Sequence, residues 1–209
     1  MIAIVDYGAG NLTSVKRALD YLEIESFITA DPGELLSAER IIFPGVGHAA
    51  SAMRILNQRG LHTALKEAFN SGIPIMGICL GTQIILSHSD EGGTGCVGLI
   101  EGNCPKFCLK DKRLKIPHMG WDSIKVVKEH PVLKSVKPED EFYFVHSYYP
   151  QPSDRESVLA ECEYETVFPA VIGRSSLVAT QFHPEKSGPA GLRILEAFST
   201  WDGLDGLTC

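Results

Sequence analysis

The sequence predicts an α/β fold: a mostly parallel central sheet flanked by helices, with an antiparallel β addition. Short apolar runs alternate with segments whose apolar residues recur at helical spacing through roughly the first 90 residues. This alternation is typical of parallel strands joined by helices that cover the sheet. After that point, strand-like segments follow one another with turns between them. We expect these later strands to run antiparallel beside the parallel core.

Apolar periodicity and turn residues place the individual elements. In the first part of the chain we expect strands at 2–8, 25–30, 40–45 and 73–78, and helices at 11–22, 49–56, 61–72 and 80–89. In the second part we expect strand-like segments at 97–109, 122–128, 142–149, 157–164, 169–174 and 177–182, and a last helix at 189–201. The helix at 11–22 illustrates the pattern, because Leu12, Val15, Leu19 and Leu22 recur on one face.

Composition indicates one soluble domain over residues 1–201, followed by a tail at 202–209 that we expect to be disordered. The chain has 209 residues, of which 44% are hydrophobic and 22% charged. Its net charge of −7 argues against a nucleic-acid partner, since phosphate binding needs a basic face. The densest basic run, 109–115, reads as a solvated hairpin. No apolar run approaches the roughly 18 residues that span a bilayer, so we expect a cytoplasmic protein without a membrane partner.

The cysteines do not predict a disulfide framework or a metal site. There are six, at positions 79, 96, 104, 108, 162 and 209. None forms a CxxC pair, and no histidine pair at zinc spacing accompanies them. Cys104 and Cys108 lie four residues apart in a strand-like segment and can share a face there. We expect reduced, mostly structural thiols and no bound metal.

Nucleotide binding is the first functional alternative, and its motif is incomplete. Gly8 and Gly10 follow the first expected strand, as in a dinucleotide fingerprint, but Thr13 stands where the third glycine belongs. The second strand offers only Asp31 as an acidic ribose ligand. No P-loop motif is present, and the glycine-rich segment 44–47 has no basic partner beside it. We therefore expect no cofactor.

Cys79 is the main candidate for chemistry. It lies between Gly77 and Gly81, after a buried strand and before a helix, as the nucleophile does in a strand–turn–helix elbow. Glycine tolerates the strained backbone angles that such a turn requires. A helix N-terminus favours the thiolate, but an adjacent base is still needed. The competing interpretation is a buried cysteine that acts as a small hydrophobe.

His183 is the best candidate base. It follows a strand, and Glu185 lies two positions further on, where an extended backbone places both side chains on the same face. The carboxylate can then accept a hydrogen bond from one imidazole nitrogen while the other faces Cys79. The competing interpretation is a surface histidine beside a solvated glutamate. His118 and His146 remain alternatives for the base on spacing alone.

Several motifs together resemble those of the class I (triad) glutamine amidotransferases. Three of them carry the family resemblance: "PGVG" (44–47), "GICLGTQ" (77–83) and "FHPEKSG" (182–188). Three more are similar to the glutaminase subunits of imidazole glycerol phosphate synthases: "DYGAGNL" (6–12), "PHMGW" (117–121) and "FYFVHSYY" (142–149). The resemblance covers essentially the whole chain and implies a flavodoxin-like fold.

The resemblance implies a role for each matching residue. Cys79, His183 and Glu185 would form the catalytic triad of a glutaminase that needs no cofactor. The oxyanion hole would come from Val46, Gly47 and Leu80. L-Glutamine would be bound by Gln83, Glu91, Ser147 and Tyr148. The partner interface would include Asn11, His118, Met119, Trp121, Tyr143 and Lys186.

The implied partner is the (β/α)₈ cyclase subunit of imidazole glycerol phosphate synthase. As a heterodimer, the two would make imidazole glycerol phosphate and AICAR in histidine biosynthesis, with ammonia passed between them. Two alternatives stay open: a paralogous ammonia donor for surface-sugar amidation, and a stand-alone cysteine hydrolase. The chain departs from the family pattern at Thr82, where methionine is typical, and in the shortened segment 90–99 that follows the expected helix.

Overall fold

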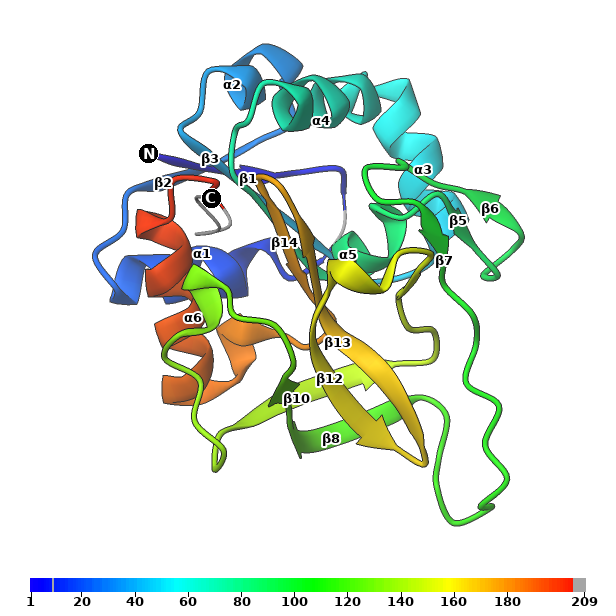
Figure 1. The fold of residues 1–209 in the computed structure, drawn as a ribbon. Coiled ribbons are helices and arrows are strands. Elements are labelled where there is room, and N and C mark those ends of the chain that lie inside the picture. The colour runs from blue at the N-terminus through cyan, green and yellow to red at the C-terminus, as the bar shows by residue number, and fades with distance from the viewer. Residues whose placement is uncertain (9, 205–209) are drawn as a thin grey trace.

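The computed structural model describes residues 1–8 and 10–204 and confirms the predicted α/β fold (Figure 1). Its main sheet has eight strands in the order β2-β1-β3-β4-β14-β13-β12-β9. The first five strands of this order are parallel, and β13, β12 and β9 continue the sheet as antiparallel neighbours. The parallel part has the strand order of flavodoxin-like sheets, whose ligands bind at the carboxyl ends of the strands.

The observed strands and helices have the following bounds. The parallel strands are β1 (Ile2–Val5), β2 (Ser26–Thr29), β3 (Arg40–Gly45), β4 (Ile75–Cys79) and β14 (Leu177–Thr180). The antiparallel members of the main sheet are β9 (Lys125–Val126), β12 (Val158–Tyr164) and β13 (Thr166–Arg174). The small two-stranded sheets pair β5 (His88–Ser89) with β6 (Thr94–Gly95), β7 (Gly102–Asn103) with β11 (Gln151–Pro152), and β8 (His118–Ser123) with β10 (Glu141–His146). The helices are α1 (Leu12–Tyr21), α2 (Pro32–Leu36), α3 (Ala49–Gln58), α4 (Leu61–Asn70), α5 (Leu80–Ile84) and α6 (Gly188–Thr200).

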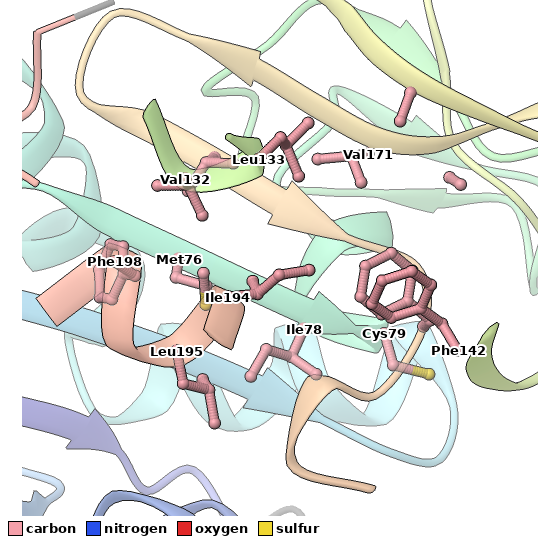
Figure 2. Close-up of a cluster of buried hydrophobic side chains, with 14 of the residues drawn as sticks. Met76, Ile78, Cys79, Val132, Leu133, Phe142, Val171, Ile194, Leu195 and Phe198 are labelled. Carbon is pink, nitrogen blue, oxygen red and sulfur yellow. The ribbon is translucent and has the colours of Figure 1, made fainter. Parts of the chain in front are cut away.

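Two hydrophobic clusters form the core, one on each face of the main sheet. Helices α1 and α6 contribute to one cluster together with β10, and helices α2 to α5 contribute to the other. Figure 2 shows the first cluster, in which Ile194 and Phe198 of α6 lie beside Met76 and Ile78 of β4. Cys79 lies at the carboxyl end of β4, at the edge of this cluster. Because buried side chains cover both faces of β4, packing fixes the backbone at Cys79.

The expected helix over 80–89 is wrong in length, because α5 ends at Ile84. Ile84, Ile85 and Leu86 are all buried, so this segment has no polar face to present to water as a surface helix does. Their carbonyl groups instead accept hydrogen bonds from the backbone N–H groups of Val97, Gly98 and Leu99. Tertiary pairing thus replaces the helical hydrogen bonds.

The expected strand over 97–109 is also wrong, since only Gly102–Asn103 pairs with another strand, β11. Residues 109–115 form an exposed turn rather than a hairpin. Cys104 is buried and Cys108 exposed, so the two thiols do not share a face. Helix α2 is an element that the periodicity missed; the Asp31 side chain caps it by accepting from the N–H groups of Gly33 and Glu34.

The last described residues pack against the domain. The Trp201 indole donates to the Leu204 carbonyl at 2.7 Å, and the Arg40 side chain donates to the Trp201 carbonyl at 2.9 Å. The remainder of the tail expected at 202–209, from 205 onward, lies outside the described residues. Among the residues that the structure describes, no helix is long and apolar enough to cross a membrane, and no cluster of metal-ligating side chains occurs.

Candidate active site

Cys79 occupies a strained turn between β4 and α5. Its φ of 55° and ψ of −107° lie outside the regions that L-residues ordinarily adopt. Neither Gly77 nor Gly81 has a positive φ among the described residues, so the expectation that the flanking glycines absorb the strain is wrong. The strain lies on the cysteine itself. Backbone strain of this kind persists only where the surrounding packing fixes it, and it is concentrated at functional sites.

The glycines are needed because neighbouring atoms leave no room for a Cβ at these positions. A Cβ on Gly81 would lie 1.9 Å from the Phe43 carbonyl oxygen, and one on Gly77 would lie 2.9 Å from the Ala179 Cβ. A Cβ on Gly45 would lie 2.1 Å from the Tyr7 hydroxyl. Helix α5 therefore begins in direct contact with the end of β3. This contact brings the "PGVG" segment beside the nucleophile.

The expected hydrogen bond between His183 and Glu185 is present. Nδ1 of His183 lies 2.7 Å from a Glu185 carboxylate oxygen, and both side chains are fully buried. The Asn11 amide donates to the same oxygen. Glu185 lies in a short 3₁₀ helix, Pro184–Lys186, rather than in extended backbone. The pairing was predicted correctly, but a tight turn produces it.

The remaining ring nitrogen of His183, Nε2, is buried and has no hydrogen-bond partner within the described parts of the chain. Burial lowers the pKa of His183, but its interactions with Cys79 and then with Glu185 outweigh burial and raise the pKa to about 10. The raised pKa favours an imidazolium beside the sulfur. Cys79, His183 and Glu185 thus have the arrangement of a nucleophile, a base and an orienting carboxylate.

A cavity of about 350 Å³ opens onto Cys79. All three residues expected to form an oxyanion hole, Val46, Gly47 and Leu80, line it. So do all four residues expected to bind glutamine, Gln83, Glu91, Ser147 and Tyr148. Pro117, Val145 and His146 complete the lining. The cavity lies at the carboxyl ends of β3 and β4, where a sheet of this strand order binds its ligands.

Two of these lining residues also make contacts within the chain. A Glu91 carboxylate oxygen accepts from the Ala49 N–H at 2.7 Å, at the start of α3. The Gln83 amide donates to the Tyr148 carbonyl at 2.9 Å and to the Gln181 side chain at 3.1 Å. Gln83 is only 5% exposed. These contacts fix the walls of the cavity.

His118 and His146, the other candidate bases, bind each other instead of Cys79. Nδ1 of His118 lies 3.2 Å from Nε2 of His146. Nε2 of His118 lies 2.6 Å from an Asp122 carboxylate oxygen, and Nδ1 of His146 lies 2.8 Å from the Tyr148 carbonyl oxygen. Both nitrogens of each ring are therefore occupied, which leaves His183 as the partner of the cysteine.

An apolar surface patch lies on the small β8–β10 sheet. Met119 and Trp121 are 63% and 51% exposed and point to the same side of β8. The Trp121 ring lies 5.8 Å from that of Tyr143, and the Lys186 ammonium lies 5.9 Å from the Tyr143 ring centre. We call these four residues the β8 patch. His118 is buried on the other side of β8, and Asn11 is bound to Glu185, so neither side chain extends this patch.

The structure also explains Thr82 and reveals residues that the motifs did not single out. The Thr82 hydroxyl is buried and donates to the Thr180 carbonyl at 2.6 Å, which ties α5 to β14. The Gln181 amide lies 3.8 Å from the Cys79 sulfur. The Tyr7 hydroxyl is buried without a partner within the described residues, and burial, then the Cys79 charge, raises its pKa. Gln181 lies two residues before His183, and this proximity is the only feature of the sequence that could have pointed to it.

A comparison with protein families decides the assignment. The model described as "Glutamine amidotransferase class-I" matches residues 3–200. The chain belongs to the class-I glutamine amidotransferases. This amidotransferase has its Cys, His and Glu at the carboxyl ends of adjacent strands β4 and β14, so the family that the motifs resembled is confirmed.

Individual relatives agree with the family. The protein named "Imidazole glycerol phosphate synthase subunit HisH" of Nitratidesulfovibrio vulgaris is 49% identical over 203 residues, which cover 95% of this amidotransferase and 95% of the relative. The protein of the same name from Bacillus licheniformis is 45% identical, again over 95% of each chain. Among solved structures, PurLQS from Thermotoga maritima matches with a TM-score of 0.72 at 20% identity, over 94% of this chain and 96% of the other, which shows a shared fold.

We expect the stability of this amidotransferase to fall in acid because of His146. Burial lowers the pKa of His146 to about 3. The hydrogen bond to the Tyr148 carbonyl raises this pKa, but the nearby His118 and His183 lower it further. Below about pH 6.5 the unfolded chain therefore binds a proton that the folded chain does not. The free energy of unfolding should fall by up to about 1.4 kcal/mol per pH unit between roughly pH 6.5 and 3. Urea unfolding at several pH values measures this.

The control is His146→Asn, whose amide can still donate to the Tyr148 carbonyl but does not titrate. Its loss of stability in acid should be smaller than that of the wild type. Equal losses in the two proteins would show that other groups cause the acid sensitivity. His183 acts in the opposite direction, because its raised pKa gives stability that is lost as the pH rises from about 6.5 toward 10.

Proposed function

We propose that this chain hydrolyses L-glutamine through a Cys79 thioester and passes the ammonia to the partner subunit of an imidazole glycerol phosphate synthase. The observation that carries the proposal is a strained, cavity-lining Cys79 beside a buried His183–Glu185 pair. The relatives named as synthase subunit HisH support the pathway, histidine biosynthesis.

Each step uses a group already described. The Cys79 thiolate attacks the side-chain amide carbon of glutamine, and the carbonyl electron pair moves onto oxygen. Backbone N–H groups of the Val46–Gly47 segment and of Leu80 stabilise that oxyanion. Protonated His183 gives its proton to the leaving ammonia and then takes one from the water that hydrolyses the thioester. Glu185 holds the imidazole in its working orientation.

The cavity also fits the rest of the substrate. Glutamine carries an α-ammonium group, and Glu91 places a carboxylate in the cavity wall. Ser147 and Tyr148 also line the cavity, and the Tyr148 carbonyl is held by hydrogen bonds from Gln83 and His146. We assign Glu91, Ser147 and Tyr148 to glutamine binding, with Gln83 supporting the wall.

The partner is needed because ammonia in water at neutral pH is mostly ammonium, which is not nucleophilic. A donor enzyme must therefore deliver ammonia to its acceptor through a closed interface. The β8 patch is a suitable docking surface, since exposed apolar patches mark interaction sites. We propose that a (β/α)₈ cyclase subunit binds there as a heterodimer.

Ammonia release with and without the purified cyclase subunit tests the function. We expect weak hydrolysis of glutamine by the chain alone and strong stimulation by the cyclase with its nucleotide ligand. Full activity without any partner would instead indicate a stand-alone cysteine hydrolase. Stimulation by the acceptor enzyme of surface-sugar amidation, and not by the cyclase, would indicate the paralogous donor.

Trp121→Ala tests the docking surface. We expect the dissociation constant of the cyclase complex to rise about 30-fold, because a central interface tryptophan typically contributes about 2 kcal/mol or more. Isothermal titration calorimetry with the purified cyclase measures it. The control is Val167→Ala on β13, which removes a similarly exposed apolar side chain, 55% exposed, outside the patch. Equal affinities for wild type and Trp121→Ala would place the interface elsewhere.

A further inference from the structure

A line of hydrogen bonds links the cavity wall to the reactive sulfur through two glutamine side chains. The Gln83 amide nitrogen donates to the Tyr148 carbonyl at 2.9 Å and to the Gln181 side-chain oxygen at 3.1 Å. The Gln181 amide nitrogen in turn lies 3.8 Å from the Cys79 sulfur. Gln83 is 5% exposed and Gln181 is fully buried. Water therefore does not replace these contacts.

The Tyr148 carbonyl determines the orientation of both amides. A carbonyl oxygen can only accept hydrogen bonds, so the NH₂ group of Gln83 must face it. That NH₂ group also faces Gln181, which must then present its oxygen to Gln83. The NH₂ group of Gln181 is left facing Cys79. Rotating either amide by 180° would bring two donors or two acceptors together in a buried site, which is strongly unfavourable.

The sulfur needs a donor at two stages of the reaction. It is negatively charged after its proton has moved to His183 and before it attacks glutamine. It becomes negative again when water has added to the thioester and the carbon–sulfur bond breaks, with the bonding electrons going to sulfur. While the sulfur carries its proton, the Val145 carbonyl, 3.9 Å away, can accept a hydrogen bond from it. Among the described residues, Gln181 provides the side-chain amide donor on the sulfur.

We propose that Gln181 is a further catalytic residue, whose side-chain N–H stabilises the Cys79 thiolate, and that Gln83 is a positioning residue that turns this N–H toward the sulfur. No proton is transferred by either glutamine. The inference rests on the proposed function, because it concerns the same cysteine. In addition to lining the cavity, Gln83 orients the amide of Gln181.

The first test is Gln181→Glu, which has nearly the same shape and can still accept from Gln83. It replaces the N–H beside the sulfur with an oxygen. We expect iodoacetamide to alkylate Cys79 about 10- to 100-fold more slowly, since a hydrogen bond to a charged group typically contributes about 1.5–3 kcal/mol. Peptide mass spectrometry follows the reaction, and exposed Cys108 in the same sample is the internal control.

Steady-state hydrolysis in the cyclase complex gives the second readout. Gln181 does not line the cavity, so kcat should fall by a similar factor while the KM for glutamine changes little. A general loss of structure would raise KM and lower the melting temperature as well. If Gln181→Glu had the same Cys79 alkylation rate and the same kcat as the wild type, the proposal would be overturned.

Gln83→Glu tests the positioning role and keeps the proposal testable should Gln181→Glu not fold. A carboxylate at position 83 cannot donate, so the Gln181 amide should turn its N–H toward it and its oxygen toward the sulfur. Alkylation of Cys79 is measured in the free enzyme without the substrate L-glutamine, so a change in substrate binding does not affect it. We expect this alkylation to slow as it does in Gln181→Glu. An unchanged rate would contradict the role of Gln83.

Thr82→Val is the matched control. It removes another buried hydrogen bond of α5, to the Thr180 carbonyl, without touching the sulfur contacts. Thr82→Val should lower the stability but leave the alkylation rate of Cys79 unchanged. If alkylation slowed by the same factor as in Gln181→Glu, packing alone would determine the reactivity of the thiol. Failure of the proposed function would look different, because wild-type enzyme with cyclase would then release no ammonia.

Discussion

Cys79→Ala is expected to lower glutamine hydrolysis by more than about 10⁴-fold, both alone and with the cyclase subunit. The substitution removes the atom that bonds to the substrate, and the remaining backbone donors can only stabilise an oxyanion that no longer forms. Ammonia release over hours, measured with a coupled glutamate dehydrogenase assay, is sensitive enough to detect the residual rate.

The control for this substitution is Cys108→Ala, because that thiol is exposed and lies outside the cavity. It should hydrolyse glutamine at the wild-type rate. Binding of the cyclase by Cys79→Ala should also be unchanged, which shows that the protein is folded. Activity of Cys79→Ala within tenfold of the wild type would rule out a thioester on this residue.

Gly81→Ala is expected to destabilise the fold by about 3 kcal/mol or more. Its methyl group would lie 1.9 Å from the Phe43 carbonyl oxygen, which belongs to the central strand β3 and cannot move aside as a flexible side chain can. Either α5 shifts away from β3 or the strand ladder is disturbed. Urea unfolding followed by circular dichroism measures the change.

Gly95→Ala is the matched control, because its methyl group meets nothing within 4 Å and its φ is not in the left-handed region. It should unfold at nearly the wild-type urea concentration. If Gly81→Ala were as stable as Gly95→Ala, the close approach of α5 to β3 would not be required for folding, and steric contact would not explain the glycine at position 81.

Local sequence was sufficient for much of the fold. The buried runs at 40–45 and 73–78 become β3 and β4, and the apolar stripe of α1 packs as expected. These elements satisfy their own backbone hydrogen bonds, either within a helix or in a regular ladder, so periodicity describes them well. The elbow at Cys79 and the His183–Glu185 pair were also visible, because each depends on residues close together in the chain.

Features that depend on distant contacts could not be predicted in this way. Helix α5 stops at Ile84 because residues 97–99 supply the hydrogen bonds instead. Gln181 contacts Cys79 across 102 positions, and the motif around His183 carries no sign of that contact. The sequence favoured His183 as the base, but His118 and His146 could be set aside only because the structure shows that these two bind each other.

The two ends of the described chain lie far from the cavity, and this matters for handling the protein. Met1 pairs with Glu39 just before β3, and Gly203 packs against Gly72, Pro74 and Ser176, which precede β4 and β14. Cys79 lies at the other end of β4, a strand of five residues, about 16 Å away along the sheet. A purification tag or surface linker joined before Met1 would therefore leave the mouth of the cavity open. Immobilised enzyme attached there should bind glutamine and its analogues as well as enzyme in solution.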